Sequence, residues 1–192
     1  LAETSLVYSQ GLGGRDEAQA AASNVPLSQQ GASPTFSKLA LDGRWTQLLP
    51  QGLQGVLVGQ AQTSFGEPLF ISEQFSLDGE TAASGYPLGT FSVDEGATLR
   101  GELIRPIALP GSMSIAPYAF GAVGRGRIDD PTYIQQGLIT AGSFGVGLRG
   151  GADVAGLPVQ GVVYAVELAR ALSDVPGEQQ GYRFNISIGV NF

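Results

Sequence analysis

Apolar and polar residues alternate without interruption over positions 183–192, the last ten of the chain. One face of an extended strand there would carry Phe184, Ile186, Ile188, Val190 and Phe192. The other face would carry arginine, asparagine, serine and glycine, because strand side chains point to alternate sides. Such a strand fits either a soluble sandwich or a membrane barrel with lipid outside and water inside. A phenylalanine as the last residue is typical of bacterial outer-membrane barrels.

Similar runs, separated by clusters of Gly, Pro, Asp and Ser, predict nine strands. They are 4–12, 36–49, 53–64, 69–78, 97–108, 114–125, 138–149, 159–172 and 182–192. Several are 10–14 residues long, whereas soluble strands are most often about 5–6 residues. Because a tilted strand needs about 9–11 residues to cross a bilayer, the lengths favour a membrane barrel. Charges also tend to lie opposite the large apolar groups, as Arg100 and Glu102 do relative to Leu99 and Leu103.

Long and short connections alternate along most of the chain. If the C-terminus faces the periplasm, the longer segments 79–96, 126–137 and 173–181 lie outside, as in outer-membrane barrels. The same count places 13–35 on the periplasmic side and the tight turn 50–52 outside, against that rule. Either one strand is misassigned near the front of the chain, or this protein departs from the rule.

Composition excludes several chemistries. The chain has neither cysteine nor histidine, so disulfides, thiolates and the commonest general base and metal ligand are lacking. We expect no enzymatic activity, no cofactor and no metal. A net charge of -7 argues against a nucleic-acid partner, which needs a basic face. No run reaches the roughly 18 apolar residues of a transmembrane helix.

The start of the chain indicates a fragment. Residues 1–5 lack the basic start and apolar run of a signal peptide, and the chain opens in a strand-like pattern. Nine strands would also leave two sheet edges unpaired, whereas bacterial single-chain barrels have an even strand number. We therefore expect residues 1–192 to be the C-terminal part of a larger barrel whose other strands precede Leu1.

Local sequences spread over the chain resemble those of one family. They are 36–39, 44–50, Gly59-Gln60, the stretch Pro68-Leu-Phe-Ile-Ser-Glu-Gln-Phe-Ser-Leu-Asp-Gly79, Asp94-Glu95-Gly96, 100–103, Ala116-Pro-Tyr-Ala-Phe120 and the terminal Phe192. Their order and spacing are similar to those of the two-partner secretion transporters, the ShlB/FhaC/HecB haemolysin secretion/activation proteins.

The resemblance implies a 16-stranded outer-membrane barrel preceded by periplasmic POTRA domains, of which this chain supplies about the last nine strands. It implies that the pore moves an unfolded exoprotein across the outer membrane without ATP. The partners would be that exoprotein, outer-membrane lipid and the barrel-assembly machinery, for which Phe192 would be the recognition signal. The alternatives are an outer-membrane protein insertion factor of the same superfamily, a diffusion porin, or a soluble β-sandwich binding module.

The chain departs from the family in its largest loop. The resemblance implies an Arg-Gly-Tyr/Phe tip folded back into the barrel, with the arginine paired to an aspartate on a following strand. Here the tip reads Ser84-Gly85-Tyr86, and Ala122 stands at the aspartate position of the stretch Phe120–Gly124. Loss of both partners together avoids an unpaired charge, which would cost about 3–5 kcal/mol.

Two explanations remain for how the tip is held. Tyr86 packing and backbone bonds would suffice, or another pair would replace the lost one. The candidate cations for that pair are Arg100 and Arg125, and the candidate loop carboxylates are Asp78, Glu80, Asp94 and Glu95. Alternatively, the tip is an ordinary turn, and Arg100 and Glu102 are simply wetted by the lumen. Trp45 and Tyr118 fit an interfacial aromatic girdle as well as they fit a functional role.

Overall fold

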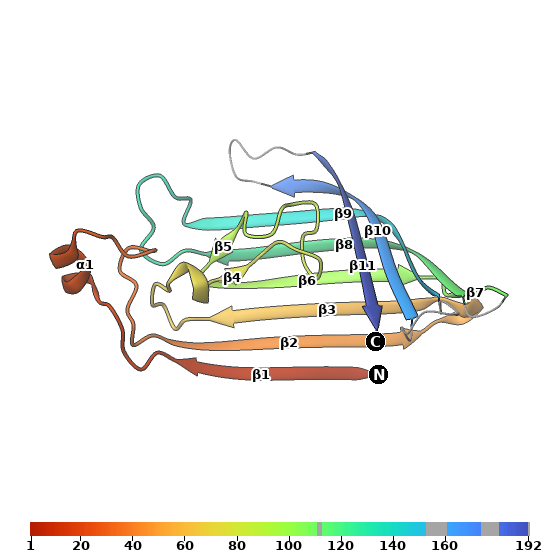
Figure 1. Cartoon of the computed structure of the whole chain (residues 1–192), viewed down its shortest axis with the longest axis horizontal. Coiled ribbons are helices and arrows are strands. Elements are labelled where there is room, and N and C mark those ends of the chain that lie inside the picture. The colour runs from red at the N-terminus through yellow and green to blue at the C-terminus, as the bar shows by residue number, and fades with distance from the viewer. Residues whose placement is uncertain (111–112, 153–160, 174–180, 192) are drawn as a thin grey trace.

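The computed structural model describes residues 1–110, 113–152, 161–173 and 181–191. Within these residues the main sheet has nine antiparallel strands in the order β1-β2-β3-β6-β8-β9-β10-β11, with β7 attached to β8. The strands are β1 (Ala2–Gln10), β2 (Ser37–Leu48), β3 (Gln54–Thr63), β6 (Glu95–Ile104), β7 (Ile107–Ala108), β8 (Met113–Arg127), β9 (Leu138–Ala152), β10 (Gly161–Ser173) and β11 (Tyr182–Asn191). Figure 1 shows the long strands side by side in one curved sheet. The expected all-β antiparallel fold is confirmed.

The main sheet buries polar side chains on its inner face and exposes apolar side chains on its outer face, the reverse of a soluble protein. On β6, Arg100 and Glu102 are buried, whereas Leu99 and Leu103 are 51% and 47% exposed. The same outer face exposes Val123, Phe144, Val146, Leu168, Phe184, Ile186 and Ile188. A soluble sandwich would bury these apolar groups, so the distribution favours lipid outside and a polar interior.

One predicted strand is wrong. Residues 69–78 do not join the main sheet; they hold the 3₁₀ turn η2 (Ile71–Glu73) and the short strand β4 (Phe75–Ser76). Strand β4 pairs with β5 (Ser92–Val93) in a separate two-stranded sheet. Leu77 is fully buried, so the alternation in this stretch reflects packing within a folded loop rather than contact with lipid.

Removal of that strand restores the alternation of connections. Segments 11–36, 64–94 and 128–137 all leave the sheet at one end, as the terminal pair Gln10–Ser37 and the neighbouring registers require. The tight connection 49–53, which includes the 3₁₀ turn η1 (Pro50–Gly52), lies at the opposite end. The discrepancy at the front of the chain therefore came from a misassigned strand, and 13–35 lies with the other long connections.

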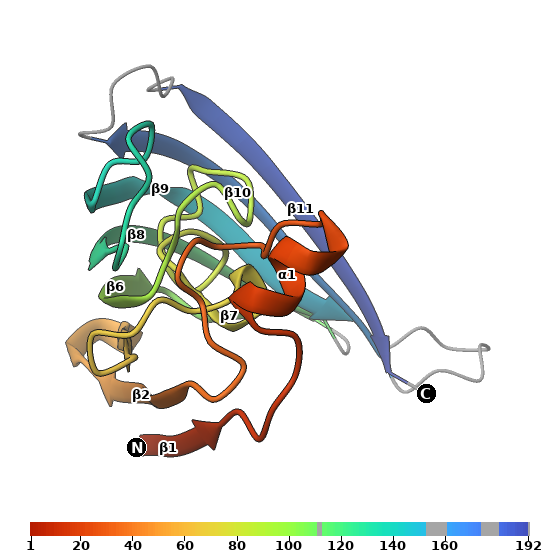
Figure 2. The same cartoon turned by 90° about the vertical axis from the view of Figure 1, so that its left-hand side faces the viewer.

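The segment 64–94, called the inserted loop below, lies against the concave face of the sheet (Figures 1 and 2). Its apolar side chains share one core with the inner face of β9 and β10, made of Leu77, Ala83, Tyr86, Phe91, Val93, Ile139, Ala141 and Ala171. The rings of Tyr86 and Phe91 meet edge to face with centroids 4.8 Å apart, a favoured aromatic geometry. The loop is thus fixed by a hydrophobic core of its own.

The connection 11–36 contains the helix α1 (Glu17–Ser23). The carboxylate of Asp16 caps it by accepting a 2.8 Å hydrogen bond from the amide of Gln19, and Asn24 ends it in the left-handed conformation. No helix within the described residues is long and apolar enough to cross a membrane.

Candidate functional site

The tip of the inserted loop, Ser84-Gly85-Tyr86, is buried against the inner face of the sheet. The approach is closest at Gly85, where a Cβ would lie 2.9 Å from both the Cα and the amide nitrogen of Ala171 on β10. These are backbone atoms that cannot move aside. Only glycine therefore fits at this point of contact.

Arg100 on β6 holds the loop tip from the wall. Its Nη1 donates to Ser84 Oγ over 2.9 Å and to the carbonyl of Ala82 over 3.4 Å. The side chain is 1% exposed, and its guanidinium carbon lies 3.7 Å from the centre of the Phe120 ring. Because both loop acceptors are neutral, the loop contributes no charge to this contact.

The charge of Arg100 is balanced by the sheet itself. Its Nη2 donates to Glu167 on β10 over 2.6 Å, and its Nε donates to Glu102 over 2.7 Å. Arg149 on β9 binds both oxygens of Glu102, at 2.7 and 2.8 Å, the bidentate geometry of a strong ion pair. Tyr118 on β8 donates to Glu167 over 2.9 Å. Two arginines and two glutamates on three strands thus form a neutral, hydrogen-bonded cluster, the only arrangement in which burial of such charges is tolerable.

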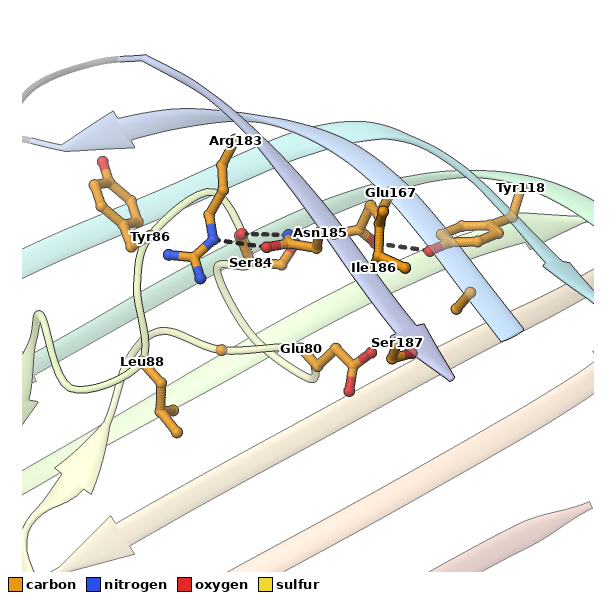
Figure 3. A pocket seen from close by; sticks show the side chains of 12 residues that line it. Glu80, Ser84, Tyr86, Leu88, Tyr118, Glu167, Arg183, Asn185, Ile186 and Ser187 are labelled. Carbon is orange, nitrogen blue, oxygen red and sulfur yellow. Dashed lines mark hydrogen bonds between the residues drawn. The ribbon is translucent and has the colours of Figure 1, made fainter. Parts of the chain in front are cut away.

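The last strand also reaches the loop tip. Asn185 on β11 donates from its side-chain amide to the carbonyl of Ser84 over 3.0 Å, and its Oδ1 accepts from Nε of Arg183 over 2.6 Å. Beside these contacts, a cavity of about 270 Å³ is lined by residues of the loop and of β8, β10 and β11. Figure 3 shows Ser84, Glu167 and Asn185 around it, with the bonds from Asn185 to Ser84 and from Tyr118 to Glu167. Within the described residues, Oε1 of Glu167 has no hydrogen-bond partner.

Two buried carboxylates stiffen the loop. Asp78 accepts from the amides of Gly89 and Phe91, at 2.8 and 2.7 Å, and so closes the part of the loop that carries the tip. Asp94 accepts from the amide of Leu69 over 2.9 Å and from the amide of Asp129 over 2.7 Å. It therefore ties the base of the inserted loop to the connection 128–137.

The structure corrects several expectations for the site. The partners of Arg100 are Glu102 and Glu167 of the sheet, not the loop carboxylates Asp78, Glu80, Asp94 or Glu95. Arg125 is exposed and pairs with Ala97, which places it on the opposite face from Arg100. Tyr118 lies in the buried cluster rather than in a girdle, whereas Trp45 is exposed. Phe192 lies outside the described residues.

Ala122 occupies an informative position. In the antiparallel pairing of β6 and β8 it lies directly across from Arg100. The wall position where the family resemblance implies an aspartate thus neighbours the arginine that holds the tip in this chain.

The sequence did not predict Glu167, Arg149 and Asn185 as partners. The only indication in the sequence is that Arg149, Glu167 and Asn185 lie on the polar faces of β9, β10 and β11, respectively. Among the described residues, the Asp and Glu side chains form no group of three or more that could hold a metal ion.

Comparison with known proteins gives one match. The family described as haemolysin secretion/activation protein ShlB/FhaC/HecB matches residues 1–150, most of the 192-residue chain. A search of the curated proteins and a search of the solved structures each found no match. The family match agrees with the outward apolar face and with the motifs distributed along the strands. The chain therefore belongs to the ShlB/FhaC/HecB family of haemolysin secretion/activation proteins.

Proposed function

We propose that this chain forms part of an outer-membrane pore that exports an unfolded partner exoprotein, with the inserted loop as its internal plug. The family is one of outer-membrane secretion transporters. The exported protein and outer-membrane lipid are its partners in this role, and the barrel-assembly machinery acts during biogenesis. One observation carries the proposal: the inserted loop is folded against the polar inner face, and Arg100 of the wall donates a hydrogen bond to Ser84 at its tip.

The location of the cation favours a plug that can be released. Removal of one partner from a buried ion pair costs about 3–5 kcal/mol. If the loop carried the arginine and the wall its carboxylate, release of the loop would break that pair and incur this cost. Here the ion pairs of Arg100 with Glu102 and Glu167 lie within the sheet. Release of the loop breaks hydrogen bonds from a charged group to neutral acceptors, each worth about 1.5–3 kcal/mol. The charges of the Arg100 cluster stay paired when the loop tip moves.

The inner face beyond the loop offers space for a passing chain. Direct cross-strand partners share a face, which places Arg44 and Glu3 on the same side as Arg100, and Asp42 on the same side as Gln60. Arg44, Glu3 and Asp42 are exposed. Thr81 at the rim of the loop donates to Gln60 over 3.0 Å. The loop thus covers the inner face from β3 to β10 and reaches Lys38 at one end of β2 through a 3.0 Å ion pair with Glu73. The inner-face side chains Glu3, Asp42 and Arg44 of β1 and β2 stay open.

The alternative role, insertion of outer-membrane proteins, is favoured by one contact. Asn185 ties the loop tip to β11, the last strand of the sheet order. A loop coupled to an edge strand could regulate opening of that edge, which insertion into the bilayer would require. Export would instead use the lumen.

Deletion of the full-length gene in its native bacterium, followed by mass spectrometry of outer-membrane and released proteins, separates the two roles. Export predicts loss of one large exoprotein from the medium and cell surface, with outer-membrane proteins unchanged, and recovery on complementation. A general loss of outer-membrane β-barrels with normal release would favour insertion. No change in either fraction would overturn both roles.

A further inference from the structure

The connection 11–36 is far longer than its two ends require. Strands β1 and β2 are antiparallel neighbours, and such a pair can be joined by a two-residue turn. The connection, called the strap below, instead reaches the segment 128–137 between β8 and β9. Strands β2 and β8 are three steps apart in the sheet, about 14 Å at the usual strand spacing. Seen from the end with the long connections, α1 lies in front of the concave side of the sheet (Figure 2).

The far side of the strap rests on two other connections. Gln135 donates to the side-chain oxygen of Gln29 over 3.3 Å, and Gln30 donates to Asp130 over 3.5 Å. The amide of Ile71, in the inserted loop, donates to Ser28 Oγ over 3.2 Å. The strap therefore contacts both the inserted loop and the 128–137 connection at the outer end of the sheet.

These contacts are weak compared with the charge cluster inside. All three bonds lie at the long end of hydrogen-bond distances, and a typical bond contributes about 0.5–1.5 kcal/mol net. A cavity of about 540 Å³, with Thr132 and Gln135 in its wall, lies under α1. The strap buries Ala20, Gln29 and Ala32, but the cavity leaves its packing against the segment 128–137 incomplete.

The base of the strap combines a fixed part, residues 11–13 with 34–36, and a glycine pair, Gly13 and Gly14, at which the chain can bend. The amide of Gly11 donates to the carbonyl of Phe36 over 2.8 Å, and that of Gly13 to the carbonyl of Pro34 over 3.2 Å. These bonds extend the β1–β2 ladder and fix the base. Gly13 and Gly14 then adopt φ angles of 130° and 156°, which other residues rarely reach. Movement of the strap can therefore be confined to residues 14–33.

We propose that the strap is a lid over the outer mouth of the pore, separate from the inserted loop, which the exported chain displaces as it leaves. The inference rests on the proposed export function. The inserted loop covers the inner face from β3 to β10. The strap crosses the end of the sheet, from β1 and β2 to the segment 128–137 (Figure 2). Weak contacts at its tip and glycines at its base allow it to swing without loss of sheet structure.

Potassium chloride conductance of the purified full-length transporter in planar bilayers tests the lid without any cargo. Residues 1–192 contain no cysteine. With any cysteine elsewhere in the full-length protein first changed to serine, Gln30→Cys with Asp130→Cys gives one defined pair for a short, thiol-cleavable bismaleimide. The pair is placed in the intact protein and in a variant whose residues 79–89 are replaced by a Gly-Ser linker. We expect the cross-link to lower conductance of the linker variant at least severalfold, and cleavage to restore it.

The two single-cysteine variants are the matched controls, and the conductance of each should not change when the bismaleimide is added or cleaved. Replacement of residues 15–32 by a short linker should raise the conductance of the intact protein, and heat-modifiable gel mobility confirms folding of each variant. If neither the cross-link nor the strap replacement changes the conductance, the lid proposal is wrong, and the pore proposal still stands. No conductance in any variant would overturn the pore and the lid together.

Discussion

Arg100 donates a 2.9 Å hydrogen bond to Ser84 Oγ, so the cation at the loop tip belongs to the sheet and the neutral acceptor belongs to the loop. The two carboxylates that balance Arg100 also come from the sheet. The contact at the loop tip is therefore asymmetric, because Arg100, Glu102 and Glu167 stay paired within the wall whether or not the tip is seated.

Loss of Arg100 should damage the sheet more than the loop. Arg100→Met leaves Glu167 without an arginine partner, and an uncompensated buried charge costs about 3–5 kcal/mol. We expect a clearly lowered midpoint of thermal unfolding, measured by heat-modifiable gel mobility of the purified protein. Addition of Glu167→Met should recover part of the loss. Equal midpoints for wild type and the Arg100 single variant would contradict the buried cluster.

Ser84→Ala should act on the loop alone. The variant removes the 2.9 Å bond from Arg100 and leaves every ion pair of the wall intact. The seated loop should lose up to about 1.5–3 kcal/mol, the usual worth of a bond to a charged group, with little change in barrel unfolding. Faster proteolytic cleavage within 79–90 would report the effect. Ser187→Ala, on the wall of the same cavity, is the control and should cleave at the wild-type rate.

Gly85→Ala should unseat the tip by steric conflict. The added methyl would meet the backbone of Ala171 at 2.9 Å, so the loop must withdraw from β10. We expect higher bilayer conductance and faster loop proteolysis than for Ser84→Ala. Gly121→Ala is matched, because a Cβ there meets no atom within 4 Å. Wild-type behaviour of Gly85→Ala would show that the tip does not pack on β10 as described.

Asn185→Ala should uncouple β11 from the loop. The amide of Asn185 is the side-chain donor that joins that strand to the carbonyl of Ser84. Its loss should speed hydrogen-deuterium exchange in both β11 and residues 82–86, while exchange in β2 and β3 stays unchanged. Faster exchange confined to β11 would mean that the strand and the loop move independently.

The fold was largely predictable because each long strand carries its own alternation. Residues 69–78 were misassigned because a loop packed inside the sheet, with Leu77 fully buried, alternates for a different reason than a lipid-facing strand. Arg125 could have been excluded by counting, since its odd position on β8 faces away from Phe120 and Ala122.

The partners of Arg100 were not predictable in the same way. Glu167 lies on β10, three strands from β6 in the sheet order, and their contact depends on the register of every strand between and on the curvature of the sheet. A single sequence gives the face on which each side chain lies, but not its height along the neighbouring strands.

The buried carboxylate of Asp94 sets how far the inserted loop can travel. It ties Leu69 and Asp129 to the start of β6, so residues 64–74 remain docked when the tip is released. The part free to move is 75–93, which both ends of the segment keep attached at the outer rim. In the proposed export role, the inserted loop would therefore move as a flap with a fixed hinge line. It would swing aside for a passing chain and return, and it would stay attached at both ends.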